Sequence, residues 1–262
     1  MPEGMFAADR PPGYLGAPPL AFAHRGGAAV GDENTAAAFG RAVEMGYTYL
    51  ETDVHATADG VVVVFHDDTL DRLLGRPGRI RDVRWADLRS HRVGGVAAVP
   101  RLDEVLEAWP NVRFNIDMKD DPAVAPTVEL VTRAGAGDRV LLASFSDRRL
   151  RRARALAPAV ATSLGMGEAT RLWLASRAGL SPRMPASVVA AQVPTHHGRV
   201  RVVDRRFVRA AHRAGLQVHV WTIDDPETIN TLLDLGVDGI MTDRIEVLRD
   251  VYAARGVWTR SS

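Results

Sequence analysis

Short apolar runs alternate with helix-like stretches along most of the chain, and this alternation is the feature that most constrains the fold. Eight runs read as strands: Leu20–His24, Tyr47–Val54, Val112–Met118, Val140–Phe145, Val160–Leu164, Val188–Val193, Gln217–Ile223 and Gly239–Thr242. The predicted helices include Thr35–Met45, Leu102–Ala108, Ala123–Ala134, Asp147–Leu156, Asp204–Ala214 and Pro226–Leu235. Strands that alternate with helices predict a parallel sheet, and eight such units in 262 residues predict one closed α/β barrel, the TIM (β/α)8 fold.

A ninth apolar run, Val61–Phe65, does not fit this alternation. It follows the second strand through Asp59-Gly60, a dipeptide typical of two-residue hairpin turns, so we expect an extra antiparallel strand. If Ala58 faces Val61, the same register places Asp53 opposite His66. Residues 67–100 then form a long connection, expected to be a cap with a short helix at Trp85–Ser90. Residues 1–19, rich in Pro and Gly, are expected to be an irregular tail before a single domain, 20–262.

Composition excludes several classes of function. With 33 basic and 32 acidic residues the net charge is +1, and no basic block or basic helix face stands out, which argues against nucleic acid or an anionic membrane as the main partner. No apolar run approaches the roughly 18 residues of a membrane helix, and the start lacks a signal-peptide pattern, so we expect a cytoplasmic protein without stable membrane insertion. Zero Cys excludes disulfides and thiolate chemistry. The oligomeric state is left open.

Acidic side chains follow two strands that should be neighbours. In a parallel barrel the active site lies at the carboxyl ends of the strands. With the two-residue period of a strand, Glu51 and Asp53 share one face of the second strand, and Asp117 shares a face of the third with Lys119. Three carboxylates so close need a proton or a cation, and oxygen ligands favour Mg²⁺ or Ca²⁺. Taken singly, each residue could equally be a turn former or a helix cap.

Two histidines have a context that suggests chemistry. His24 precedes Arg25 and a Gly pair at the end of the first strand, and His66 returns along the predicted hairpin toward Asp53. His55 lies on the ascending hairpin and could contact ligand. The remaining histidines have no comparable context: His91, His196, His197, His212 and His219. Asp67 and Asp68 are consistent with turn residues. Trp221, at the end of the seventh strand, is either barrel packing or a platform for substrate carbons.

Paired imidazoles beside a divalent cation suit phosphoryl transfer. One imidazole takes a proton from the attacking oxygen and the other protonates the leaving alcohol. The cation, Arg25 and Lys119 stabilise negative charge on phosphate. Lys119 is the single Lys among 33 basic residues, which suggests a site that needs a compact ammonium.

The chain resembles the glycerophosphodiester phosphodiesterases from about Leu20 to Leu248. The matching motifs are His24-Arg25-Gly26-Gly27, Glu33-Asn34-Thr35, Glu51-Thr52-Asp53-Val54, Phe65-His66-Asp67, Leu70-Asp71-Arg72, Pro100-Arg101-Leu102-Asp103-Glu104, Val220-Trp221-Thr222 and Gly236-Val237-Asp238-Gly239-Ile240-Met241-Thr242-Asp243. The resemblance implies a TIM barrel that hydrolyses a small-molecule glycerophosphodiester to sn-glycerol 3-phosphate and an alcohol with Ca²⁺ or Mg²⁺. It also implies an acid/base pair, His24 and His66, with three metal ligands, Glu51, Asp53 and Asp117, and phosphate contacts from Arg25 and Lys119.

Two positions depart from the family pattern. Asp117 stands where the family commonly has Glu, which leaves the identity of the ion open, and Leu73-Leu74-Gly75 replaces a frequent Thr-Thr-Gly. Related barrels let a substrate hydroxyl attack and form a cyclic phosphate, a route that needs the same base. The alternatives are a lysophospholipase D-type activity on lysolipids, with an apolar trough near Leu164–Leu180, and a noncatalytic barrel that binds phosphorylated ligands.

Overall fold

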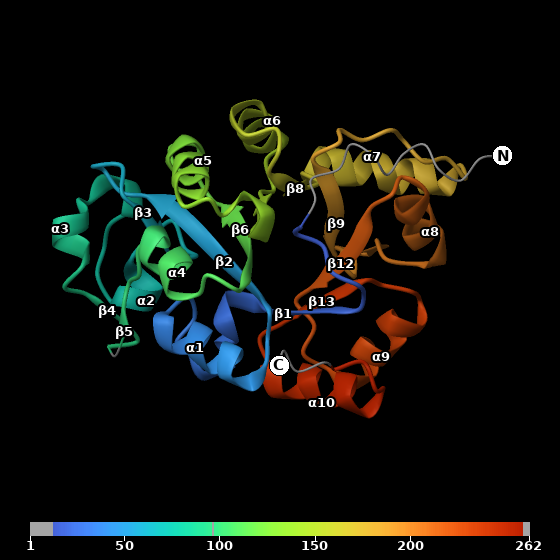
Figure 1. Ribbon diagram of the computed structural model, residues 1–262, viewed down its shortest axis with the longest axis horizontal. Coiled ribbons are helices and arrows are strands. Elements are labelled where there is room, and N and C mark those ends of the chain that lie inside the picture. The colour runs from blue at the N-terminus through green and yellow to red at the C-terminus, as the bar shows by residue number, and fades with distance from the viewer. Residues whose placement is uncertain (1–12, 96, 259–262) are drawn as a thin grey trace.

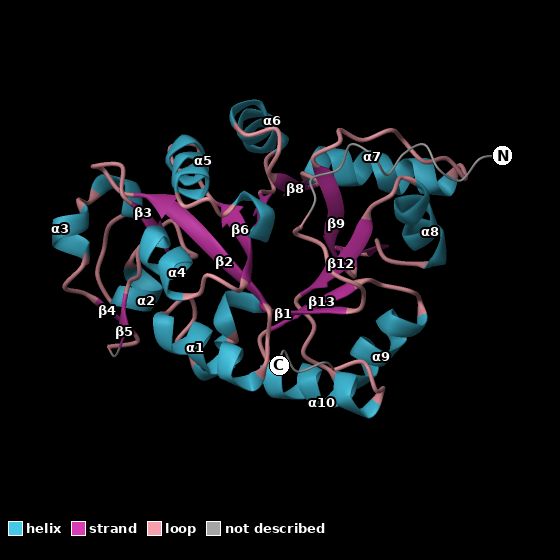
Figure 2. Cartoon of the chain, viewed as in Figure 1, coloured by secondary structure: helices cyan, strands magenta, loops and turns pink. Residues whose placement is uncertain are grey.

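The computed structural model describes residues 13–95 and 97–258, and it contains a closed ring of eight parallel strands surrounded by helices (Figures 1 and 2). The ring strands are β1 Leu20–Ala23, β2 Tyr49–Ala56, β6 Arg113–Met118, β7 Val140–Ala143, β8 Ala161–Ser163, β9 Val188–Pro194, β12 Gln217–Trp221 and β13 Gly239–Thr242. Strand β1 pairs with both β13 and β2, which closes the sheet. The predicted TIM barrel is confirmed.

Helices cover the outside of this ring (Figure 2). They are α1 Ala36–Met45, α4 Leu102–Ala108, α5 Val124–Arg133, α6 Asp147–Leu156, α7 Met166–Arg177, α8 Arg205–Arg213, α9 Pro226–Asp234 and α10 Ile245–Ala254. Short 3-10 turns occur at η1 His24–Gly26, η2 Ala28–Val30, η3 Ile80–Asp82 and η4 Gly137–Arg139. The six predicted helices are present. Helices α7 and α10 were not predicted, and neither begins with the Ser, Thr, Asp or Asn cap that marks a helix start in a sequence.

The alternation of side chains along the strands divides the core into two layers. Phe114, Ile116 and Met118 of β6 pack outward against the helices, as the two-residue period predicts. A separate apolar layer fills the barrel interior, and it includes Phe22 and Tyr49. The segment before β1 is attached to this layer, because the Tyr49 hydroxyl donates a hydrogen bond to the carbonyl oxygen of Tyr14 at 2.8 Å. Residues 13–19 contain no helix or strand, and the rest of the predicted tail, 1–12, lies outside the described residues.

The extra strand is present, but its predicted register is wrong by one residue. Strand β3, Val62–Val64, is antiparallel to β2 and pairs Val54 with Val64, so Phe65 rather than His66 lies opposite Asp53. The cause is the turn, which has three residues instead of two. Thr57 N–H donates to the Val61 carbonyl, and Gly60 closes the loop in the left-handed region at φ 79°.

The segment after β3 forms a small layer with its own apolar core. It contains α2 Asp71–Leu74, α3 Trp85–Leu88, β4 Arg92–Val93 and β5 Ala97–Ala98. Phe65, Leu70, Ile80 and Leu88 are fully buried in this core. A further hairpin, β10 His196–His197 with β11 Val200–Arg201, follows β9. The apolar core of the segment after β3 holds that long connection beside β2 and β3.

The positive charge of the chain is unevenly distributed along the sequence. Residues 147–213 contain 14 Arg and three acidic residues, a net charge of +11, so the rest of the chain carries −10. Five of the ten residues of α6 are Arg. This basic stretch and the acidic remainder of the chain nearly cancel, which gives the overall charge of +1. Among the described residues, no helix has the length and apolarity needed to span a membrane.

Candidate active site

Three buried carboxylates meet at the carboxyl ends of β2 and β6. The register pairs Asp53 directly with Asp117, and Glu51 lies one pleat earlier on the same face as Asp53. All three side chains are buried. Burial, followed by the charge of Asp53, raises the pKa of Glu51 to about 7. The pKa of Asp53 is lowered because the charges of Lys119 and Arg25 outweigh its burial. Such a cluster favours a bound cation.

Lys119 supplies positive charge within this cluster. Its Nζ lies 2.8 Å from a carboxylate oxygen of Asp53 and 2.8 Å from one of Asp117. The second oxygen of Asp117, Oδ1, is buried without a hydrogen-bond partner, a state that is costly for a carboxylate. Among the described residues, no three carboxylate or imidazole groups are already placed as a metal cage. The donor types fit a hard divalent cation, provided that the Lys119 ammonium moves aside.

His24 is held between two carboxylates from different strands. Its Nδ1 lies 2.6 Å from Asp243 Oδ1, just after β13, and its Nε2 lies 3.7 Å from Glu51 Oε2. Burial favours the neutral ring, but the charge of Glu51 and the hydrogen bond to Asp243 together raise the pKa of His24. The role of Asp243 is not evident from the sequence alone. Its position at the end of a ring strand was the available signal.

His66 lies near Asp53 despite the register error, because the hairpin returns past the mouth of the barrel. Its Nδ1 is 2.7 Å from Asp67 Oδ1, while its Nε2 has no hydrogen-bond partner within the described chain. Burial lowers the pKa of His66. His55, which we expected could contact ligand, is buried instead: its Nδ1 is bound to Asp120 at 3.0 Å and its Nε2 lies 3.1 Å from the His66 carbonyl oxygen.

A chain of ion pairs joins Arg25 to the His66 side of the site. Arg25 Nη1 donates to Glu33 at 2.9 Å, Glu33 accepts from Arg72, and Arg72 Nε donates to Asp67 at 2.7 Å. Arg25 itself adopts a left-handed conformation at φ 52°, which directs its backbone N–H to Glu51 Oε2 at 3.0 Å. Asp67, for which the sequence left a turn role open, bridges His66 and Arg72. Its pKa is lowered to about 2, first by Arg72.

Asn34 is a further site residue whose role is not evident from the sequence alone. Its amide donates to Asp53 Oδ2 at 2.9 Å, and its carbonyl oxygen accepts from the Thr52 hydroxyl at 2.8 Å. It is a non-glycine residue at φ 59°, an uncommon conformation that is frequent at functional sites. The side chain fixes one oxygen of Asp53 and leaves the other to Lys119.

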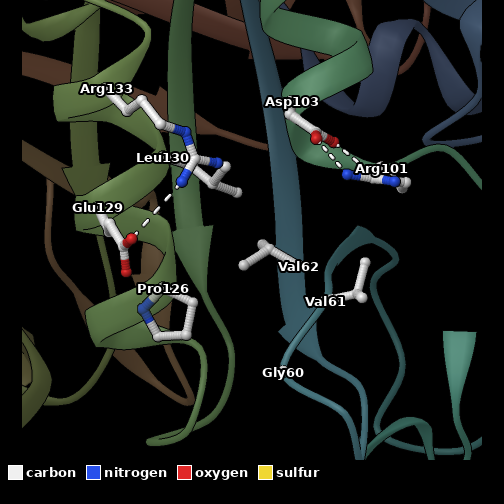
Figure 3. A pocket seen from close by; sticks show the side chains of 9 residues that line it. All are labelled: Gly60, Val61, Val62, Arg101, Asp103, Pro126, Glu129, Leu130 and Arg133. Carbon is white, nitrogen blue, oxygen red and sulfur yellow. Dashed lines mark hydrogen bonds and ion pairs between the residues drawn. The ribbon is translucent and has the colours of Figure 1, made fainter.

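Trp221 is half-buried at the barrel mouth. Its ring meets the Phe145 ring edge to face at a centroid distance of 5.5 Å. The centroid of the Phe145 ring lies 5.8 Å from Lys119 Nζ. Both predicted roles, packing and substrate platform, remain compatible with this position. A shallow pocket of about 200 Å³ between the β3 turn and helices α4 and α5 contains none of these residues (Figure 3). Its arginines are paired with Asp103 and Glu129.

Comparisons with known proteins identify the family and the fold of the chain. Residues 24–247 match the model of the Glycerophosphoryl diester phosphodiesterase family. The chain is 43% identical over 245 residues to a probable glycerophosphodiester phosphodiesterase 2 of Mycobacterium tuberculosis, covering 91% of this chain and 92% of that protein. A putative glycerophosphoryl diester phosphodiesterase structure from Silicibacter pomeroyi shares the fold, with a TM-score of 0.78 at 24% identity over 94% and 97% of the chains. An Oleispira antarctica phosphodiesterase, in complex with the product sn-glycerol-3-phosphate, has a TM-score of 0.76 at 23% identity over 90% and 97%.

Proposed function

Given that the chain belongs to the glycerophosphoryl diester phosphodiesterase family, and so is a phosphoric diester hydrolase, we propose that it hydrolyses glycerophosphodiesters by paired-imidazole catalysis. The products are sn-glycerol 3-phosphate and an alcohol. The observation that carries the mechanism is that His24 lies beside Glu51 and His66 lies near Asp53, so both imidazoles flank one carboxylate cluster.

The two imidazoles divide the proton transfers. The Nε2 of His66 takes the proton of the attacking oxygen as that oxygen bonds to phosphorus. Attack by water gives sn-glycerol 3-phosphate directly, whereas attack by the glycerol 2-hydroxyl gives a cyclic phosphate that a water molecule must open in a second step. The bond from phosphorus to the alcohol oxygen breaks, and the protonated His24 donates its Nε2 proton to that oxygen. A raised pKa suits the acid and a lowered pKa suits the base, and each Nδ1 is held by a carboxylate, Asp243 or Asp67.

Positive charge stabilises the phosphate during this transfer. The family generally uses a divalent cation, which would be held by Glu51, Asp53 and Asp117 and would supply charge stabilisation at a nonbridging oxygen. Asp117 Oδ1 has no hydrogen-bond partner and is available as a ligand. Released from its bridge, Lys119 donates to phosphate, and Arg25 orients a second oxygen. Mg²⁺ and Ca²⁺ are both compatible with these ligands.

Substrates with different leaving groups test the division of labour. On glycerophosphocholine, His24→Ala and His66→Ala should each lower kcat/KM by about 10²–10⁴. A nitrophenyl phosphodiester releases its phenolate without needing a proton. On this substrate the kcat/KM of His24→Ala should fall less than roughly tenfold, while that of His66→Ala should fall as much as on glycerophosphocholine. His91→Ala, outside the cluster, is the control. If both variants cleave both substrates as the parent does, paired-imidazole catalysis is refuted.

The same assay separates the two substrate classes. Glycerophosphocholine, a diester without an acyl chain, should be hydrolysed with a higher kcat/KM than lysophosphatidylcholine. The lysophosphatidylcholine is assayed below its critical micelle concentration. The reverse order would assign the lysophospholipase D activity instead. Accumulation of a cyclic phosphate in a ³¹P NMR time course would identify the glycerol 2-hydroxyl as the attacking group.

A further inference from the structure

The barrel mouth is bordered on one side by a surface that combines exposed apolar side chains with exposed arginines. We call it the rim surface and define it as Phe145, Met166, Arg199–Arg201 and Arg205–Arg206. These residues follow β7, β8 and β9 at their carboxyl ends, the end of the ring that holds the carboxylate cluster. Phe145 links the rim surface to that cluster through its contacts with Trp221 and Lys119.

The apolar members of the rim surface are unusually exposed. Phe145 is 51%, Met166 53% and Val200 46% exposed, and they supply three of the six large apolar side chains with high exposure in the described chain. Contacts fix them in place: Met166 N–H donates to the Phe145 carbonyl at 3.0 Å, and Trp173 Nε1 donates to the Arg201 carbonyl at 3.1 Å. Solvent-exposed apolar side chains that gather at one edge of a protein are typical of an interaction surface.

Residues 147–213 contain many more arginines than acidic residues, although Asp121, outside this stretch, pairs with Arg148 and Arg149. Residues 147–213 carry +11, and two of their three acidic residues are used inside the helical layer: Glu168 pairs with Arg154 at 2.6 Å and Asp204 with Arg177 at 2.5 Å. Asp204 also caps α8, which places Arg205 and Arg206 at the mouth end of that helix. The four rim arginines, Arg199, Arg201, Arg205 and Arg206, are exposed, so this surface attracts an anionic partner.

The mixture of side chains favours a lipid surface over a nucleic acid. Single strands are bound by cations together with aromatic rings that stack on bases, and duplexes by phosphate contacts that need no exposed aliphatic side chains, whereas two of the three apolar side chains here are aliphatic. Aliphatic and aromatic groups that enter the acyl boundary, surrounded by arginines that meet phosphate, are typical of peripheral membrane contacts. This proposal differs from the expectation drawn from net charge, because the overall sum of +1 does not reflect the local excess of arginines.

We propose that the rim surface docks the barrel mouth on the headgroup layer of an anionic phospholipid bilayer. The contact is peripheral: the arginines are attracted to the anionic headgroups, and the side chains of Met166 and Val200 enter the boundary between headgroups and acyl chains. It brings the mouth to diesters that arise at the membrane.

Vesicle sedimentation tests this docking without reference to catalysis. The parent should bind phosphatidylglycerol-containing vesicles at 0.1 M NaCl, bind phosphatidylcholine vesicles weakly, and be released at 0.5 M NaCl. Arg199→Gln/Arg205→Gln/Arg206→Gln should weaken partition more than about tenfold, since each arginine near an anionic surface strengthens binding roughly fivefold. Met166→Ser/Val200→Ser should weaken it at low salt as well.

A matched control has the same change of charge elsewhere. Arg81→Gln/Arg84→Gln/Arg89→Gln alters exposed arginines around η3 and α3, across the molecule from α7 and α8 (Figure 1). It should bind vesicles nearly as the parent does, and all variants should hydrolyse soluble glycerophosphocholine normally. The proposal is overturned if the parent ignores anionic vesicles, if the control loses as much binding as the rim variants, or if duplex DNA binds the rim while vesicles do not.

Discussion

Lys119 holds together two carboxylates that would otherwise repel each other. Its ammonium contacts Asp53 and Asp117 at 2.8 Å each, in a position reached from the strand end that also carries Asp117. A guanidinium is larger and planar, which explains why this one basic position is not Arg in a chain so rich in Arg. Lys119 therefore couples the charge of the site to its occupancy by a cation.

Removal of this ammonium should destabilise the cation-free protein. Lys119→Met leaves two buried carboxylates without their shared partner, so we expect a loss of about 3 kcal/mol in urea unfolding with EDTA present. Added Mg²⁺ or Ca²⁺ should then stabilise the variant more than the parent, because the ion replaces the lost charge. Equal stabilisation of both proteins would show that the cation does not bind at Asp53 and Asp117.

His219 gives the stability of the barrel a dependence on pH. Burial beneath Phe22 lowers its pKa to about 3, and its ring nitrogens lie 3.0 Å from Gln217 and 3.3 Å from Gln192. Unfolded chains bind a proton below about pH 6.5 and the folded barrel does not, so this contribution is complete above pH 6.5 and is lost as the pH falls. The loss at pH 5 should be about 2 kcal/mol.

Urea midpoints at pH 7.5 and pH 5.0 measure this effect against His219→Gln. The variant starts less stable because its shape differs, but it should lose about 2 kcal/mol less between the two pH values than the parent. If the parent and the variant respond identically to pH, His219 is not the group that links protonation to unfolding.

At the scale of elements, the β2–β3 hairpin determines where His66 lies. The three-residue turn Ala58–Gly60 shifts the pairing by one residue, yet His66 still reaches the cluster because it lies beyond the paired part of β3. His55 then anchors the His66 backbone from the opposite strand at 3.1 Å. The hairpin is thus the element that carries the second imidazole to the first.

Two glycines should respond oppositely to Ala. Gly60 has φ 79°, and although a Cβ there meets no atom within 4 Å, Gly60→Ala should cost about 1 kcal/mol from backbone strain alone. Gly40, inside α1 and equally open, should gain about 0.5–1 kcal/mol as Gly40→Ala. Chemical denaturation of both variants measures the difference. A neutral or stabilising Gly60→Ala would contradict the left-handed turn.

At the scale of the whole molecule, the sequence predicts the parts of the structure that repeat. Alternation predicts eight strands and the faces of Asp53 and Asp117, because a two-residue period is a local property. It does not predict Asp243 as the partner of His24, since 219 residues separate them. The register failed because Asp59-Gly60 lies here in a three-residue turn, and the local excess of arginines in residues 147–213 is not visible in the overall charge because the rest of the chain is acidic.

Chelation should test the acidic cluster in the intact enzyme. With EDTA the rate on glycerophosphocholine should fall by more than about a hundredfold, since a cation contributes several kcal/mol of charge stabilisation. Add-back of Mg²⁺, Ca²⁺ and Mn²⁺ identifies the preferred ion. An unchanged rate after chelation would exclude the proposed role of Glu51, Asp53 and Asp117.

Closure of the ring through β1 has a consequence for how the enzyme is assembled. His24 ends the strand that joins the last strand to the second, and its two carboxylate partners come from either side of this seam. A folding intermediate with seven strands docked but the seam open would have helices and much of its core, yet would lack an oriented His24. Recovery of turnover during refolding should therefore require the pairing of β1 with β13 and β2. We expect it to lag behind the recovery of far-ultraviolet ellipticity, which measures helix and strand content.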